Sequence, residues 1–208
     1  MFESDKPNVY EKVYQELLPR LASADIAGAA SDLGLTLQDG AALVPCFGRD
    51  YLVGKNGVTL ADGSKAPLNH RIVLAYYIMH GGRGENADRF VPYRELPGGQ
   101  DFARALSQIV EGRAADFFGG KLEQLKSAAA ALGAASGEEH APGDASFVVN
   151  ALPKLPLLMS FYDADEDFPA EVKVFYDITA PNFLDLECLA VLGLLLVLEL
   201  EAASGEGS

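Results

Sequence analysis

The spacing of apolar residues predicts about five helices along the chain. An amphipathic helix is expected from Asn8 to Leu21, where apolar side chains recur at helical spacing. A second helix, from Leu68 to Met79, is apolar on nearly every side, which is typical of a buried helix. The other three are expected after Gly98-Gly99 (apolar face Phe102, Leu106, Ile109 and Val110), over Ala114 to Leu132, and over Asp185 to Ala202.

Short apolar runs between turn residues predict strands in two regions. The first region is 41–60, where Asn56-Gly57 is a strong hairpin signal. The second holds a three-strand meander, expected at Ser146 to Leu152, Leu155 to Tyr162 and Val172 to Asp177. Residues 134–145, rich in Gly, Ser and Glu, are expected to be a mobile surface loop.

This order of elements predicts an α+β fold, with a mostly antiparallel sheet from the N-terminal hairpin region and the C-terminal meander packed on the helices. The length of 208 residues fits a single domain over 1–203, followed by a disordered tail over 204–208.

The charge of the chain argues against two classes of partner. The formal net charge is −14, and residues 114–208 alone carry 4 basic and 16 acidic side chains. A nucleic-acid or anionic-membrane surface needs clustered Lys and Arg, which this sequence lacks. We therefore expect no nucleic acid and no membrane as partners.

The sequence shows no membrane span, no signal peptide and no C-x-x-C motif. The longest apolar run, Cys188 to Leu198, is shorter than the roughly 20 residues of a membrane span, and no signal peptide is visible. The two cysteines, Cys46 and Cys188, form no C-x-x-C pair, so the chain has no four-thiolate site of its own. A cytoplasmic protein is expected.

An acidic segment between the second and third strands of the meander has the composition of a metal site. Asp163, Asp165 and Asp167 have the spacing of a calcium loop, but Phe168 and Val174 occupy the positions that need Gly and Glu. An EF-hand is therefore excluded. A looser magnesium or calcium site that includes Asp177 remains open, beside the simpler interpretation of a solvated turn.

Two further features are compatible with ligand binding. Arg94 precedes Gly98-Gly99 and a helix start, where an anion would find free N–H groups, although an ion pair with the acidic segment is the simpler interpretation. Such a pair would place Arg94 and the acidic segment around one shared cleft. Aromatic residues are compatible with an apolar pocket or with ordinary core packing: Tyr76, Tyr77, Tyr93, Phe161 and Tyr162.

Several short motifs in order resemble one family. They are Ile72-Val73-Leu74-Ala75-Tyr76-Tyr77-Ile78, Val91-Pro92-Tyr93-Arg94-Glu95-Leu96-Pro97-Gly98-Gly99, Gly143-Asp144, Leu152-Pro153-Lys154, Asp165-Glu166-Asp167-Phe168-Pro169 and Phe175-Tyr176-Asp177. Together they resemble DUF3786, a prokaryotic domain of unknown function found largely in anaerobes. The resemblance implies an association with redox or corrinoid (one-carbon) systems. It marks Arg94, Glu95, Asp165, Glu166 and Asp167 as site candidates. This chain lacks the cysteine cluster and the Trp found in some relatives.

Three functions are compatible with these observations. The first is a ligand-binding or accessory domain, with a protein partner in a redox or corrinoid system and a ligand site formed by Tyr77, Tyr93, Arg94, Glu95, Asp165, Glu166 and Asp167. The second is a metal-dependent enzyme that uses residues 163–167, with Asp163, Asp165, Asp167 and Asp177 as ligands. The third is a homodimer through residues 188–200. The sequence identifies neither a cofactor nor a reaction.

Overall fold

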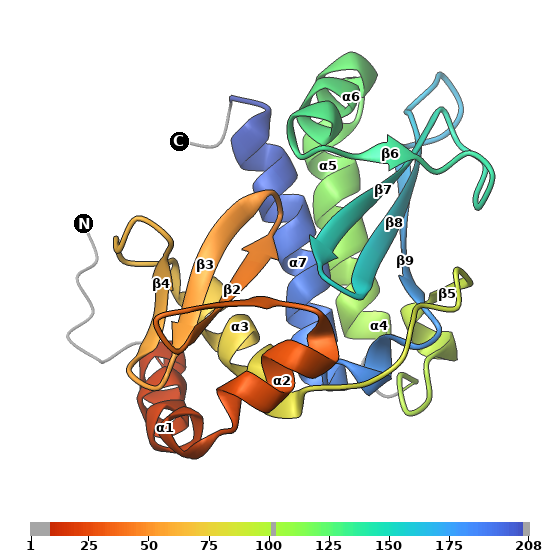
Figure 1. The fold of residues 1–208 in the computed structure, drawn as a ribbon. Helices are drawn as coiled ribbons and strands as arrows, with labels where there is room; N and C mark the ends of the chain where they lie inside the picture. The colour runs from red at the N-terminus through yellow and green to blue at the C-terminus, as the bar shows by residue number, and fades with distance from the viewer. Residues whose placement is uncertain (1–8, 101–102, 206–208) are drawn as a thin grey trace.

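The computed structural model describes residues 9–100 and 103–205, which form two antiparallel sheets and the helices packed on them (Figure 1). The α+β prediction is therefore confirmed. One sheet has four strands in the order β1-β2-β3-β4, and the other has five in the order β5-β9-β8-β7-β6. Asn8, Phe102 and residues 206–208, which belong to predicted elements, lie outside the described residues.

The four-stranded sheet is the hairpin region that the sequence predicts. It consists of β1 (Thr36–Gln38), β2 (Ala41–Cys46), β3 (Arg49–Gly54) and β4 (Gly57–Leu60). The β3–β4 turn is the two-residue link Lys55-Asn56, because Gly54 pairs with Gly57. Gly57 has a φ of +123°, and the Tyr14 hydroxyl of the first helix lies against it and accepts a hydrogen bond from Val58 N at 2.9 Å. Glycine is required there for both reasons.

The five-stranded sheet contains the predicted meander. Its strands are β5 (Phe90–Pro92), β9 (Glu171–Asp177), β8 (Leu155–Tyr162), β7 (Ala145–Leu152) and β6 (Ala135–Ser136). The predicted surface loop over 134–145 is wrong at its start, where the short strand β6 pairs with β7 and Gly137 N donates to Ser146 O. The two sheets meet where Phe47 N donates to Ala151 O at 3.1 Å.

Two helices cross at the centre of the fold, α3 (Leu68–His80) and α7 (Leu186–Ala203). Figure 1 shows α7 passing between the two sheets, with α1 (Val9–Ser23) and α2 (Ile26–Leu33) at one end. Most of residues 188–200 are buried within the chain itself, and Ala190, Val191, Leu194 and Leu198 are half-buried. Helix α7 is therefore the apolar axis of the core, and a dimer contact through 188–200 stays a prediction.

A single helical rod packs against β9 of the five-stranded sheet and against α7. It consists of α4 (Ala103–Leu106), the π-helical turn η2 (Ser107–Gly112) and α5 (Arg113–Phe118). The prediction of one helix over 114–132 is wrong, because Gly119-Gly120 ends α5 and α6 (Leu122–Ala131) follows separately. Gly120 has a φ of +73° and donates its N–H to Asp163. Two short 3-10 turns complete the fold, η1 (Tyr93–Glu95) and η3 (Ala180–Asn182).

None of the helices within the described residues combines the length and the apolar character that a membrane crossing needs.

Candidate functional site

A groove of about 560 Å³ lies between the helical rod and the outer edge of the five-stranded sheet. We call it the rod–sheet groove. Its walls come from β5, η1, the α4–η2 segment and β9. The apolar part of the lining is Pro92, Tyr93, Ala103, Leu106, Val110, Val174 and Phe175, and the polar part is Arg94, Arg104, Ser107, Gln108, Glu111 and Lys173.

Strand pairing places the first wall of this groove. β5 pairs with the end of β9, so that Pro92 lies opposite Phe175 and η1 begins immediately after it. The Tyr93 hydroxyl donates to Leu186 O at 2.7 Å, which ties η1 to the start of α7. Burial, with a smaller contribution from the Asp185 charge, raises the pKa of Tyr93 to about 12, so the phenol remains a donor at neutral pH.

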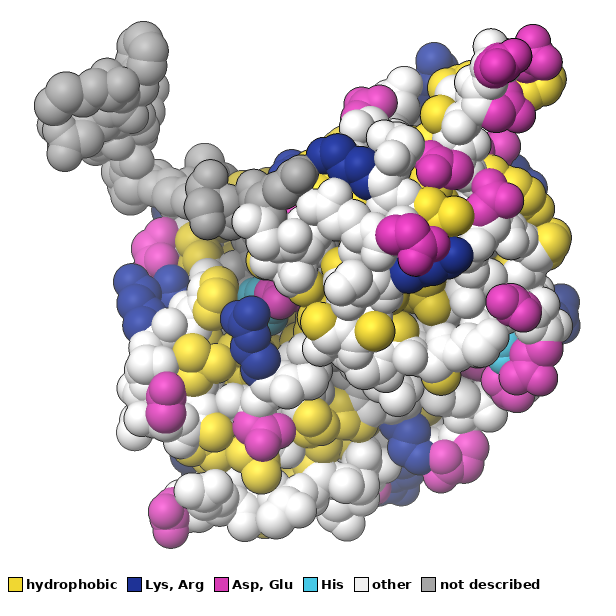
Figure 2. All heavy atoms as spheres, turned by 90° about the horizontal axis from the view of Figure 1, so that it is seen from above, with side chains coloured by type: hydrophobic (Ala, Val, Ile, Leu, Met, Phe, Trp, Pro, Cys, Tyr) yellow, Lys and Arg dark blue, Asp and Glu magenta, His cyan; other side chains and the backbone are white. Residues whose placement is uncertain are grey.

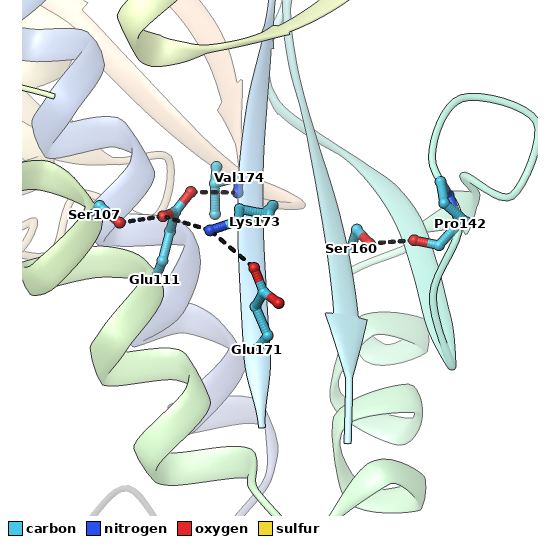
Figure 3. A network of polar contacts seen from close by, with 7 residues as sticks. All are labelled: Ser107, Glu111, Pro142, Ser160, Glu171, Lys173 and Val174. Atoms are coloured by element: carbon cyan, nitrogen blue, oxygen red, sulfur yellow. Dashed lines mark hydrogen bonds and ion pairs between the residues drawn. The ribbon is translucent and has the colours of Figure 1, made fainter. Parts of the chain in front are cut away.

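The second wall depends on Glu111 in the π-helical turn. β5 pairs only with residues 175–177 of β9, and Val174 is the residue of β9 just before this paired stretch. Glu111 accepts a hydrogen bond from Val174 N at 3.1 Å (Figure 3). The Ser107 hydroxyl donates to the same carboxylate. The Glu111 side chain thus joins the rod to β9. π-Helical turns such as η2 are frequent at functional sites.

The rim of the groove is positively charged, although the whole chain is acidic. Arg94 is 70% exposed, and its only ion pair within the described residues is a loose one with Glu95, at 4.0 Å. Arg104 is exposed and has no ion pair within the described part of the chain. Lys173 lies 3.9 Å from Glu111 and 3.1 Å from Glu171. Apolar walls with cations at the mouth are suited to an organic anion.

The acidic segment 163–167 lies elsewhere, and two of its carboxylates bind its own backbone. Asp165 accepts hydrogen bonds from Asp167 N and Phe168 N, and Asp163 accepts them from Ala164 N and Gly120 N. These side chains line a different hollow, together with Asp144, Tyr162 and Phe168. No group of three or more His, Cys, Asp or Glu side chains among residues 9–100 and 103–205 is arranged to hold a metal ion.

The expected shared cleft of Arg94 and the acidic segment is wrong. The segment precedes Glu171 at one end of β9, whereas Arg94 follows Pro92, which pairs with Phe175 toward the other end. Four residues of strand separate these ends by about 13 Å. The two groups line separate hollows, so neither neutralises the other.

The remaining predicted site residues are dispersed. Tyr77 is fully buried and donates its hydroxyl to Pro153 O, and it does not line the groove. Glu95 points to solvent beside Arg94. Asp177 is fully buried and accepts hydrogen bonds from Ala87 N, Arg89 N and Thr179. Of the predicted ligand-binding residues, the groove brings together only Tyr93 and Arg94.

The cysteines give no nucleophile. Cys46 and Cys188 are both free and buried. Burial raises the pKa of both thiols above the ordinary range, which keeps them protonated and unreactive.

The sequence analysis missed five of the six polar lining residues, which are Arg104, Ser107, Gln108, Glu111 and Lys173. Arg104, Gln108 and Glu111 recur at spacings of four and three residues, so they share one helix face. That spacing was the available signal. The sequence gives no local sign that these residues lie against β9, because Lys173 and Val174 are more than sixty residues away.

The arrangement defines an α+β domain with a cationic, apolar-walled groove between a helical rod and a sheet edge. The chain belongs to the family described as "Domain of unknown function (DUF3786)", whose profile matches residues 25–199. This range contains every residue of the groove. No curated protein and no solved structure matches the chain.

Proposed function

We propose that this protein is a ligand-binding domain that holds an amphipathic organic anion in the rod–sheet groove. The observation that carries the proposal is the gathering of Arg94, Arg104 and Lys173 at the mouth of an apolar groove in an otherwise acidic chain. An accessory role in a cytosolic redox or corrinoid system, which the family resemblance implies, is part of the same proposal.

The balance of charges supports an anion rather than a cation. Glu111 is the one acidic residue in the described lining, and its oxygens face Val174 N, the Ser107 hydroxyl and Lys173. Its charge is therefore largely engaged by the protein. The guanidinium groups of Arg94 and Arg104 are exposed and keep their hydrogen-bonding capacity for a carboxylate, sulfonate or phosphate.

The apolar walls support a ligand with a hydrophobic body. Leu106, Val110, Val174 and Phe175 face the space below the rim. Pockets of about 300–1,000 Å³ hold ligands of drug or cofactor size, and this groove falls in that range at about 560 Å³. We expect the body of the ligand to lie against β9 and its charge to face the two arginines.

The test uses the fluorescent aromatic sulfonate ANS as the probe. The Arg94→Gln/Arg104→Gln variant is expected to bind ANS about 30-fold more weakly, from about 1 kcal/mol for each lost charge contact. Arg89→Gln is the matched control, because Arg89 is exposed and does not line the groove. Dodecanoate should displace the probe, whereas dodecyltrimethylammonium, which has the same tail with a positive charge, should not.

Equal ANS affinity in the double variant and the control would refute the groove as an anion site. Native mass spectrometry of protein purified without oxygen complements the titration, because a co-purifying acidic ligand that the double variant loses would identify the natural occupant. A ligand retained by the double variant would place the binding site elsewhere.

A further inference from the structure

The hollow beside the acidic segment combines exposed aromatic side chains with carboxylates. It has a volume of about 560 Å³ and lies at the end of the five-stranded sheet where β8 is joined to β9. We call it the acidic hollow. Its lining does not overlap that of the rod–sheet groove, so the inference is independent of the proposed function. The lining residues are Asp144, Tyr162, Asp163, Asp165, Phe168, Pro169, Ala170 and Glu171.

Two aromatic side chains of this hollow are left in contact with solvent. Phe168 is 70% exposed and Tyr162 is 42% exposed, whereas most large apolar side chains of the described residues are buried. Pro169 and Ala170 extend the apolar part of the same lining. Apolar surface gathered at a hollow and surrounded by polar residues is typical of an interaction site.

The carboxylates of the hollow are held in place by backbone donors, and each keeps a free oxygen. Asp144 Oδ2 accepts a hydrogen bond from Asp163 N at 2.8 Å. Asp163 Oδ1 accepts one from Gly120 N at 2.6 Å, and Asp165 Oδ1 accepts one from Phe168 N at 2.7 Å. The second oxygen of each of these three carboxylates has no partner within the described residues. Each is therefore an oriented acceptor that is available to a ligand.

The charge of the hollow is strongly negative, because a neutral N–H donor does not remove the charge of a carboxylate. The described lining contains four carboxylates and no Lys, Arg or His. Glu171 has one ion pair, with Lys173 at 3.1 Å. The other three carboxylates have no ion pair within the described part of the chain. Such a cluster attracts positive charge.

The space-filling view agrees with this combination. The β8–β9 connection lies at the top of the molecule in Figure 1, and Figure 2 views the molecule from that end. Acidic and hydrophobic side chains gather together there, toward the upper right of the view.

Charge complementarity indicates what fits this surface. Aromatic faces attract Arg and Lys side chains, and carboxylate oxygens bind the same side chains through charge-assisted hydrogen bonds. The carboxylates come from two separate stretches of the chain, at 144 and at 163–171, so a matching partner carries several spaced positive charges. A small amine carries one charge, whereas a segment of a protein carries several.

We propose that the acidic hollow docks a basic segment of a partner protein, in which Arg or Lys side chains alternate with apolar ones. The cationic groups pair with the free oxygens of Asp144, Asp163 and Asp165. The remaining side chains cover Phe168 and Tyr162, which removes their apolar surface from water.

Fluorescence anisotropy with a labelled octapeptide of alternating Arg and Leu tests the proposal on the whole chain. The peptide is expected to bind with a Kd of about 100 μM or tighter. Raising the salt concentration from about 0.05 M to about 0.3 M should weaken binding at least about fivefold, because the attraction is between charges near the surface. The same peptide with Gln in place of each Arg should not bind measurably.

A triple variant tests the carboxylates without removing their contacts to the backbone. Asp144→Asn/Asp163→Asn/Asp165→Asn keeps an accepting oxygen at each position and removes three charges. It is expected to bind the peptide at least about tenfold more weakly. The control removes three charges at exposed positions outside the hollow and should change the affinity by less than about twofold. It is Glu16→Gln/Asp39→Asn/Asp50→Asn.

A single variant tests the aromatic part of the surface. Phe168→Ala is expected to weaken peptide binding about threefold, because a cation–aromatic contact at an exposed site is lost. Leu37→Ala removes another exposed apolar side chain, on the other sheet, and should leave the affinity unchanged. Circular dichroism confirms that all the variants are folded.

Three results would overturn the proposal. The first is the absence of peptide binding to folded wild-type protein, and the second is equal affinity of the triple variant and its charge-matched control. The third is a dimer in analytical ultracentrifugation that the triple variant lacks, because a second copy of the chain would then be the occupant. None of these results affects the rod–sheet groove, which is tested with ANS and with variants at Arg94 and Arg104.

Discussion

Replacing Asp177 with asparagine is expected to lower the free energy of unfolding by about 3 kcal/mol at pH 7. Asp177 ends β9 and is fully buried. One carboxylate oxygen accepts hydrogen bonds from Ala87 N at 3.2 Å and from both the N–H and the hydroxyl of Thr179, and the other accepts from Arg89 N at 3.3 Å. The side chain therefore joins the segment before β5 to the turn before α7.

The magnitude follows from what asparagine keeps and loses. Its oxygen can still accept from Ala87 and Thr179, but its amide group places a donor against Arg89 N–H. The lost bond is one to a charged acceptor, worth about 1.5–3 kcal/mol, and the bonds that remain become weaker as the charge is removed. Because β5 positions η1, the variant should also perturb the wall of the groove that carries Tyr93 and Arg94.

The dependence on pH has a definite sign. Burial alone would raise the pKa of Asp177, but the hydrogen bonds from Thr179, Ala87 and Arg89 outweigh it and hold this pKa below its usual value of 3.8. A carboxyl whose pKa is lower in the folded state stabilises the fold at pH values above its unfolded pKa, and this contribution disappears as the pH falls through the folded pKa. The difference between Asp177→Asn and wild type should accordingly stay constant down to about pH 5 and shrink below it.

Urea denaturation followed by circular dichroism at pH 7, 5 and 3 measures both effects. Asp116→Asn is the matched control, because Asp116 is exposed and should change stability by less than about 0.5 kcal/mol. A deficit in Asp177→Asn of under about 0.5 kcal/mol at pH 7, or one that grows as the pH is lowered, would refute the reasoning.

Two further variants test how α7 is packed. Gly193→Ala should destabilise the protein by about 1–3 kcal/mol in urea denaturation despite the better helix propensity of alanine, because its Cβ would overlap the buried Tyr176 hydroxyl. Gly112→Ala, whose Cβ would meet only ordinary contacts, should be neutral or stabilising, and equal effects of the two would contradict this packing. A double-mutant cycle of Arg113→Ala and Glu201→Ala should give a coupling near 1 kcal/mol, from two hydrogen bonds of 2.6 Å that join α5 to α7, and additivity would show that the pair contributes nothing.

Some elements had no signal in the sequence. β1 is three residues long and exposed throughout, so it shows no alternation of apolar and polar positions and exists only through its pairing with β2. Helix α2 is rich in small residues that hide its periodicity, although Asp25 caps its start and Gly34 its end. The break at Gly119-Gly120 was not predicted, because apolar residues continue on both sides of it.

The rod–sheet groove could not be predicted from the sequence for a related reason. The groove joins residues 92–94, 103–111 and 173–175. No spacing rule connects such distant positions, because strand register and helix crossing bring them together. For that reason the sequence identified Arg94 as a site residue but wrongly placed it beside the acidic segment 163–167.

What the sequence determined by itself is local: the meander, the hairpin, the buried character of α3, and the family to which the chain belongs. These follow from periodicity and turn chemistry over a few residues. The apolar run of α7 showed that its surface must be covered, by the chain's own core or by a second copy. Only the tertiary structure showed how much of this surface the chain's own core covers, because that depends on how both sheets and α3 pack around α7, and the packing involves residues from the whole length of the chain.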